Sequence, residues 1–148
     1  MSLPATAADY RALARRRLPR FLFDYLDGGA GEERTLAANV DDFAGVRIRQ
    51  RVLVDTSRVD TGAVLLGESC ALPLALAPVG LAGMMARRGE ARAGRVAEAI
   101  GVPFTLSTVG VCPLKEVAAA RGAPFWFQLY MLRDRGAVEA ILDAAWAA

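Results

Sequence analysis

The chain has 148 residues, of which 54% are hydrophobic and 23% are charged, and its formal net charge is only +2. This composition is typical of a soluble folded protein with one buried core, and the balanced charge argues against nucleic-acid binding. No histidine is present, so these residues lack the commonest general base and the commonest metal ligand. We therefore expect no metal site, and any base catalysis must use another group or another segment.

The amino-terminal residues 1–45 have the pattern of three helices. Apolar residues recur at helical spacing from Ala7 to Arg17, with arginines on the other face. Pro19 can occupy the first turn of a second helix, and Gly28 and Gly29 are expected to end it in left-handed backbone. A third helix is predicted from Glu32 to Phe43.

Residues 46–70 are predicted to form a β-hairpin. Val46 and Ile48 alternate with arginines, and a second apolar run covers residues 63–66 before a glycine. Alternation of this kind is typical of short strands with one exposed face.

From residue 71 to residue 148, short apolar runs alternate with helical stretches, as they do in parallel βα units. Three such units fit either a doubly wound sheet or the start of a barrel. A dinucleotide-binding sheet would carry G-x-G-x-x-G after its first strand, but a proline stands in that turn. We therefore predict an α/β fold, the amino-terminal portion of a (β/α)8 TIM barrel with about three βα units. The predicted strands are Leu72 to Ala77, Phe104 to Leu106 and Phe125 to Leu129, and the predicted helices run from Gly89 to Ile100, from Pro113 to Ala120 and from Arg135 onward.

A complete barrel takes roughly 250 residues, so residues 1–148 are interpreted as one partial barrel domain. A barrel sheet that stops after three strands leaves an unpaired edge and apolar faces without partners. We expect marginal stability for the isolated chain, and a cooperative thermal transition of a purified monomer would contradict this.

Polar groups stand at the carboxyl end of each predicted strand, where barrel enzymes place their ligands. Backbone groups after the first strand offer a surface for a flat ring, and side chains after the second and third strands can form hydrogen bonds. The candidate site residues are Pro78, Val79, Gly80, Ser107, Gln128 and Tyr130.

Each polar side chain in this set also has a structural interpretation. Ser107 could cap the next helix, Gln128 could satisfy a buried backbone group, and Tyr130 could be a core aromatic with a solvated tip. These alternatives stay open on the residues alone.

Several separated motifs resemble the FMN-dependent 2-hydroxy-acid dehydrogenase and oxidase family. They match its segments in order and spacing, and they read FDYLDGGA at residues 23–30, LAPVGL at 76–81, PFTLST at 103–108 and WFQLY at 126–130. Within the family, STVGVCP at residues 107–113 is most similar to the bacterial L-lactate dehydrogenases that pass electrons to quinone.

The resemblance implies FMN as the cofactor. Pro78, Val79 and Gly80 match the backbone that borders the reactive part of the flavin, and Ser107 and Gln128 match side chains that bind its polar edge. Tyr25 and Tyr130 match two tyrosines that face the substrate. The family's catalytic histidine and carboxylate-binding arginine come later in sequence, so we expect no catalytic residue here and no activity from these residues alone.

The resulting hypothesis is oxidation of a small 2-hydroxy acid, L-lactate, to pyruvate, with quinone as the electron acceptor. The absence of a secretory signal in residues 1–9 favours the cytoplasm. The resemblance also implies a homo-oligomer at full length and peripheral attachment to the cytoplasmic face of the inner membrane. Three alternatives remain: an enzyme for mandelate or glycolate, a catalytically inactive truncated barrel, or a flavin-binding barrel of different chemistry.

Overall fold

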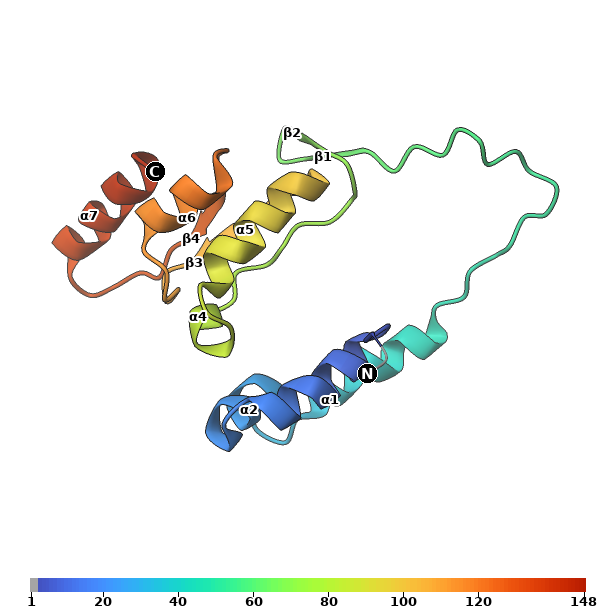
Figure 1. Cartoon of the computed structure of the whole chain (residues 1–148), viewed down its shortest axis with the longest axis horizontal. Coiled ribbons are helices and arrows are strands. Elements are labelled where there is room, and N and C mark those ends of the chain that lie inside the picture. Colours follow the sequence, from blue (N-terminus) through green and yellow to red (C-terminus); the bar gives the residue numbers. More distant parts are fainter. Residues whose placement is uncertain (1–2) are drawn as a thin grey trace. The chain divides into compact units, whose positions relative to one another are not determined.

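The computed structural model describes residues 3–148, which form two compact units that divide in sequence between Ser57 and Arg58 (Figure 1). The first unit is helical, and the second alternates short strands with helices. The predicted α/β class is therefore confirmed. In the part of the chain that is described, no helix has both the length and the apolar character needed to cross a membrane.

The first unit begins with helix α1 (Ala7–Arg17), as the apolar spacing predicts. Its amino end carries a capping box, in which the Thr6 hydroxyl accepts a hydrogen bond from the Asp9 amide at 3.2 Å, and the Asp9 carboxylate accepts one from the Thr6 amide at 2.9 Å. These bonds satisfy two amides that the first helical turn leaves unpaired. An ion pair between Arg11 and Asp27 joins α1 to helix α2 (Arg20–Asp27).

Helix α3 (Arg34–Asp41) follows and continues into the 3-10 helix η1 (Asp42–Gly45). The predicted left-handed end of α2 is wrong, because Gly28 has extended backbone with φ −81° and the positive φ occurs later, at Gly31. The Asp24 carbonyl still accepts a hydrogen bond from the Gly28 amide at 3.0 Å, so the last turn of α2 is closed without left-handed backbone.

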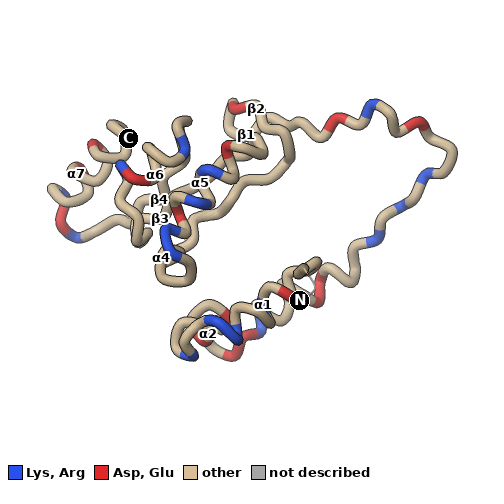
Figure 2. Tube along the Cα trace, viewed as in Figure 1, with Lys and Arg blue, Asp and Glu red and all other residues tan. Residues whose placement is uncertain are grey.

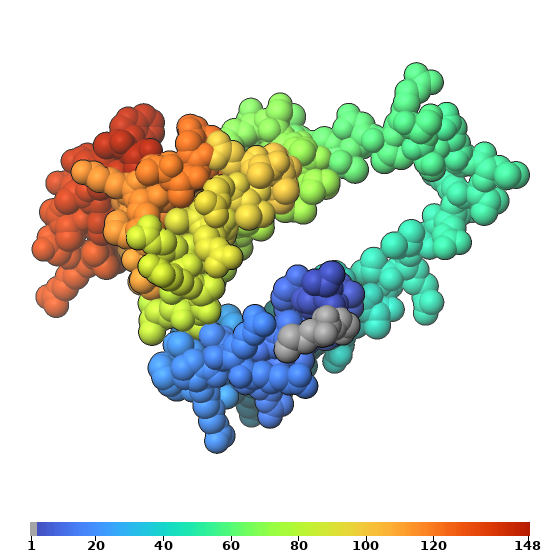
Figure 3. All heavy atoms as spheres, in the orientation of Figure 1, coloured from blue at the N-terminus to red at the C-terminus, as the bar shows by residue number. Residues whose placement is uncertain are grey.

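The hairpin predicted for residues 46–70 is wrong over most of its length. The structure pairs only β1 (Ala63–Leu65) with β2 (Glu68–Cys70), which are antiparallel. Residues 46–62 are exposed and form no strand, and Figure 3 shows a single run of side chains in this part of the chain. Its arginines, blue in Figure 2, are spread along it. An alternating pattern becomes a strand only where a partner strand completes its hydrogen bonds, and these residues have none in the described chain.

Two strands in the second unit are parallel neighbours, β3 (Thr105–Ser107) and β4 (Trp126–Gln128). The predicted first strand is reduced to one parallel bridge between Leu76 and Phe104. Proline cannot donate a ladder hydrogen bond, and prolines at positions 73 and 78 flank the bridged residue. The three segments nevertheless run in the same direction and in the predicted order.

Four helices follow these segments: α4 (Ala82–Met85), α5 (Gly89–Ile100), α6 (Leu114–Arg121) and α7 (Arg135–Trp146). Gly101 and Gly122 end α5 and α6 with φ of +72° and +79°, a conformation that glycine adopts without strain. The short helix α4 was not predicted from the sequence. Pro113 lies just before α6 and not in its first turn.

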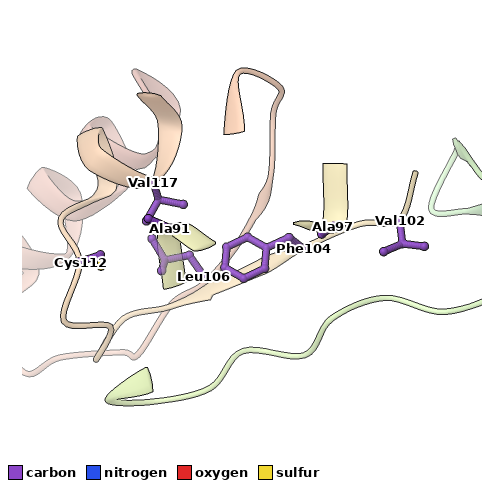
Figure 4. Close-up of a cluster of buried hydrophobic side chains, with 7 residues drawn as sticks. All are labelled: Ala91, Ala97, Val102, Phe104, Leu106, Cys112 and Val117. Carbon is purple, nitrogen blue, oxygen red and sulfur yellow. The ribbon is translucent and has the colours of Figure 1, made fainter. Parts of the chain in front are cut away.

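The core of the second unit lies between β3 and the helices α5 and α6 (Figure 4). Phe104 packs against Phe125 with ring centroids 6.2 Å apart. Gly94 of α5 faces the Phe104 ring, and a methyl group at this glycine would lie 3.5 Å from the ring, in ordinary van der Waals contact. The buried cluster comprises Ala91, Ala97, Val102, Phe104, Leu106, Cys112 and Val117.

Candidate functional site

The carboxyl ends of the three parallel segments lie along one edge of the second unit. Thr105 pairs with Trp126 and Ser107 with Gln128, while the bridge at Leu76 adds the third segment on the other side of β3. The Leu81 amide donates a hydrogen bond to the Val109 carbonyl at 3.0 Å, which joins the loops that follow the first and second segments. The structure therefore brings the predicted strand-end residues of these segments to a common edge.

Ser107 and Gln128 form a direct side-chain pair across this edge. The Ser107 hydroxyl donates to Gln128 Oε1 at 3.0 Å and accepts from the Val109 amide at 3.3 Å. Ser107 is 5% exposed, and it does not cap α6, which begins seven positions later, at Leu114. The bond to Oε1 orients the carboxamide, and Gln128 Nε2 donates no hydrogen bond to another described residue.

Thr108 holds the next part of β4 in place. Its hydroxyl donates to the Gln128 carbonyl at 2.5 Å and accepts from the Tyr130 amide at 2.9 Å. Its own amide donates to the same carbonyl at 3.0 Å. Thr108 thus fixes the backbone on both sides of residue 129, although no motif assigns it a role. From the sequence, its place beside Ser107 after the second predicted strand indicates a short hydrogen-bonding side chain at this edge.

The loop after the first segment presents backbone groups. Among the described residues, the amides of Val79 and Gly80 have no hydrogen-bond acceptor, and the Val79 side chain is half exposed. The Tyr130 side chain is also half exposed. Tyr25 lies on α2 in the first unit, where its side chain is exposed.

A buried carboxylate lies behind these loops. Glu90, in the first turn of α5, is 2% exposed, and its Oε1 accepts from the Gly83 amide at 2.9 Å and from the Val111 amide at 2.8 Å. Burial alone would raise the pKa of this carboxyl, but hydrogen bonds from the amides of Val111, Glu90 and Gly83 outweigh it and lower the pKa. Burial also raises the pKa of the Cys112 thiol, and the neighbouring carboxylate raises it further.

A comparison with known protein families identifies the family of the chain that carries this edge. Residues 14–148 match the family model described as FMN-dependent dehydrogenase. The chain belongs to this family. The resemblance to FMN-dependent 2-hydroxy-acid dehydrogenases predicted from the motifs is therefore confirmed.

Curated relatives of this family member are named L-lactate dehydrogenase. The protein of Caulobacter vibrioides (strain NA1000 / CB15N) is 61% identical over 144 residues, which cover 97% of this chain and 38% of the relative. The protein of Chromohalobacter salexigens is 58% identical over 97% of this chain and 37% of the relative. The chain thus spans less than two fifths of the length of these relatives.

Solved structures of the family also match. A soluble mutant of the membrane-associated (S)-mandelate dehydrogenase from Pseudomonas putida has a TM-score of 0.87 and 36% identity, over 95% of this chain and 40% of that one. A mandelate oxidase has a TM-score of 0.85 and 38% identity, over 95% and 40% of the two chains. The described residues of this family member form no closed barrel.

The residues at the strand-end edge fit FMN, the cofactor of the family. The polar edge of its ring system carries oxygen and nitrogen acceptors, which require donors. Gln128 Nε2 and the amides of Val79 and Gly80 are donors without partners in the described chain. These three groups suit a ligand that accepts hydrogen bonds along a flat edge.

Proposed function

We propose that this chain is the amino-terminal part of an enzyme that uses FMN to oxidise L-lactate to pyruvate and passes the electrons to quinone. The observation that carries the proposal is the oriented carboxamide of Gln128, held by Ser107 at 3.0 Å with its Nε2 free. The relatives named L-lactate dehydrogenase, up to 62% identical, favour lactate as the substrate.

In this proposal the three parallel segments are the first strands of a (β/α)8 barrel, and residues 1–148 are one partial domain of it. Helices α1 to α3 and the hairpin β1–β2 precede the barrel strands in sequence. The likeness to mandelate dehydrogenase over 95% of this chain and 40% of that structure supports this interpretation.

In this proposal the residues of this chain bind and orient the flavin and the substrate. Gln128 Nε2 donates to the polar edge of the flavin, and Ser107 keeps the carboxamide turned toward it. The amides of Val79 and Gly80, after Pro78, border the reactive part of the ring. When bound, FMN supplies an acceptor for the hydrogen on carbon 2 of the substrate. Tyr25 and Tyr130 bind the substrate, while the catalytic base comes from a later segment.

A second substrate is favoured by a specific observation. The solved structures that match this chain are described as mandelate dehydrogenase and mandelate oxidase, which supports a larger 2-hydroxy acid. One of them is described as membrane-associated, and this supports a place on the cytoplasmic face of the inner membrane. We also propose a homo-oligomer.

Turnover by the enzyme that contains this chain tests the function. L-lactate, glycolate and (S)-mandelate are each supplied to the purified protein, under air and with a soluble quinone, while flavin absorbance is followed. We expect lactate to bleach the flavin fastest and quinone to restore it. Faster bleaching by mandelate would move the assignment to the second substrate, and a colourless protein that does not take up FMN would reject the flavin proposal. A preparation of residues 1–148 alone should retain no FMN.

A further inference from the structure

We propose that Glu90 is a positioning residue that ties the loop after the first parallel segment to the loop after β3, and so sets the geometry of the flavin-binding edge. The proposal rests on the function proposed above. Glu90 belongs to α5 and not to the edge itself, so it would act through the two loops that carry the edge residues.

One oxygen of Glu90 joins the first turn of α4, which directly follows the first of these loops, to the loop after β3. Oε1 accepts from the Gly83 amide at 2.9 Å and from the Val111 amide at 2.8 Å. Gly83 lies three positions after Gly80, and Val111 lies four positions after Ser107. A second link between the same loops is the 3.0 Å hydrogen bond from the Leu81 amide to the Val109 carbonyl. The carboxylate therefore fixes the spacing of the two loops immediately behind the edge.

The space around the carboxylate is closely filled. A methyl group at Gly83 would lie 2.7 Å from Val111 Cβ and 2.8 Å from Glu90 Oε2. Contacts under 3.0 Å force a displacement, so the two loops meet at a distance that only glycine allows. A shift of the carboxylate would have to move at least one of these loops.

The burial of Glu90 distinguishes it from an ordinary acidic residue in a first helical turn. An exposed glutamate is sufficient to interact with a helix dipole. Glu116 also lies in a first helical turn, that of α6, where it is part-exposed and pairs with Arg88 at 3.0 Å. Glu90 is buried and is absent from the ion pairs of the described residues. Two charge-assisted bonds from backbone amides to Oε1 offset part of the cost of this burial, while Oε2 is buried without a hydrogen-bond partner among the described residues.

The test uses the FMN-loaded enzyme that contains this chain. Glu90→Leu removes the acceptor, Glu90→Gln keeps an oxygen that can accept both amides, and Glu98→Leu and Glu98→Gln are matched controls at an exposed position of the same helix. The dissociation constant of FMN is measured by fluorescence quenching. Hydrogen exchange is measured at single-residue resolution for the amides of Gly83 and Val111, and thermal unfolding shows whether each variant is folded.

Glu90→Leu should weaken FMN binding by about tenfold or more, because two part-buried amides lose an ionised acceptor. Glu90→Gln should stay within about threefold of the wild type, since the neutral oxygen keeps both bonds at lower strength. Both Glu98 variants should bind FMN as the wild type does. In the wild type the two amides should be protected, and Glu90→Leu should remove the protection of both.

A folded Glu90→Leu variant with wild-type affinity for FMN would overturn the proposal. If this variant does not fold, the wild type and Glu90→Gln decide: unprotected amides at Gly83 and Val111 in the wild type would show that the tie does not exist. A wild-type protein that binds no FMN would reject the function proposed above, and the exchange of these two amides would still decide whether Glu90 joins the loops.

Discussion

The two units of the chain differ in what stabilises them. Among the described residues of the first unit, only Leu22 and Phe23 are buried, while Phe21 and Phe43 are 67% and 75% exposed. The second unit has a contiguous core in which Leu106 and Val117 are almost completely buried. Local capping and exposed ion pairs, of which Arg11–Asp27 joins two helices, therefore support the first unit, whereas long-range packing supports the second.

This difference indicates which unit can fold without a partner surface. Isolated short helices are marginal in water because their formation does not offset the loss of chain entropy. Large apolar side chains of α2 and η1, which are typical of a buried helix face, are exposed in the described chain. In the proposed full-length enzyme, later segments would supply the apolar surface that the first unit lacks.

The largest expected effect is at Leu106, which is 2% exposed at the centre of the core. Leu106→Ala should lower the free energy of unfolding of the second unit by about 3 kcal/mol, because it leaves a cavity in close packing. Leu26→Ala, at a half-exposed position of the first unit, is the control and should change it by about 0.5 kcal/mol or less. Both tryptophans lie in the second unit, so urea denaturation followed by tryptophan fluorescence measures this unit. Equal effects of the two substitutions would contradict the comparison.

The second unit is also where sequence prediction succeeds best. Helix α5 was predicted from Gly89 to Ile100 and is observed over those residues, since an amphipathic pattern and a terminal glycine are both local signals. Residues 46–49 alternate apolar residues with arginines, and they form no strand. Strand formation depends on a partner that local sequence does not specify, and this is why the hairpin was predicted too early in the chain.

The same limit applies to the candidate site. Ser107 and Gln128 could be predicted because both stand at strand ends, and the structure joins them by a hydrogen bond. The roles of Thr108 and Glu90 depend on bonds to residues about 20 positions away. Glu90 follows a glycine at a helix start, so the sequence pattern indicates only a favourable charge near the helix dipole.

Thr108 allows a smaller test of the long-range bonds in the second unit. Thr108→Val keeps the shape but removes a donor to the Gln128 carbonyl and an acceptor for the Tyr130 amide. We expect a loss of about 2 kcal/mol in urea denaturation, since two hydrogen bonds are lost and one amide is left without its partner. Thr61→Val removes one exposed bond, to the Ala71 carbonyl, and should cost about 0.5 kcal/mol. A Thr108→Val variant as stable as Thr61→Val would show that this edge is not held by the threonine.

One glycine with positive φ in each unit allows the cost of a substitution by alanine to be compared between the two units. Gly101 has φ +72° and a methyl group there would lie 3.0 Å from Ala71 Cβ, whereas Gly31 has φ +59° and open space around it. Gly101→Ala should cost about 1.5 kcal/mol, from left-handed backbone and crowding together, and Gly31→Ala about 1 kcal/mol, from backbone alone. Unfolding followed by tryptophan fluorescence should shift for Gly101→Ala, and unfolding followed by the far-UV circular dichroism of the helices should shift for Gly31→Ala. A response of tryptophan fluorescence to Gly31→Ala would show that the two units unfold together.

The smallest expected effect is the response of the first unit to acid. Hydrogen bonds from the Ala5 and Thr6 amides, and then from the Thr6 hydroxyl, lower the pKa of Asp9 below its ordinary 3.8. A carboxyl with a lowered pKa stabilises the folded state fully above the unfolded pKa, and that stabilisation is lost as the pH falls through the folded pKa. Helix α1 should therefore lose helicity below about pH 4, as measured by amide chemical shifts of its first turn. Asp9→Asn should remove this pH dependence, whereas Asp41→Asn, at the end of α3, should leave it unchanged. Because the box is exposed, the change should be confined to the first unit, and an equal change at β3 would mean that the capping box supports more than its own helix.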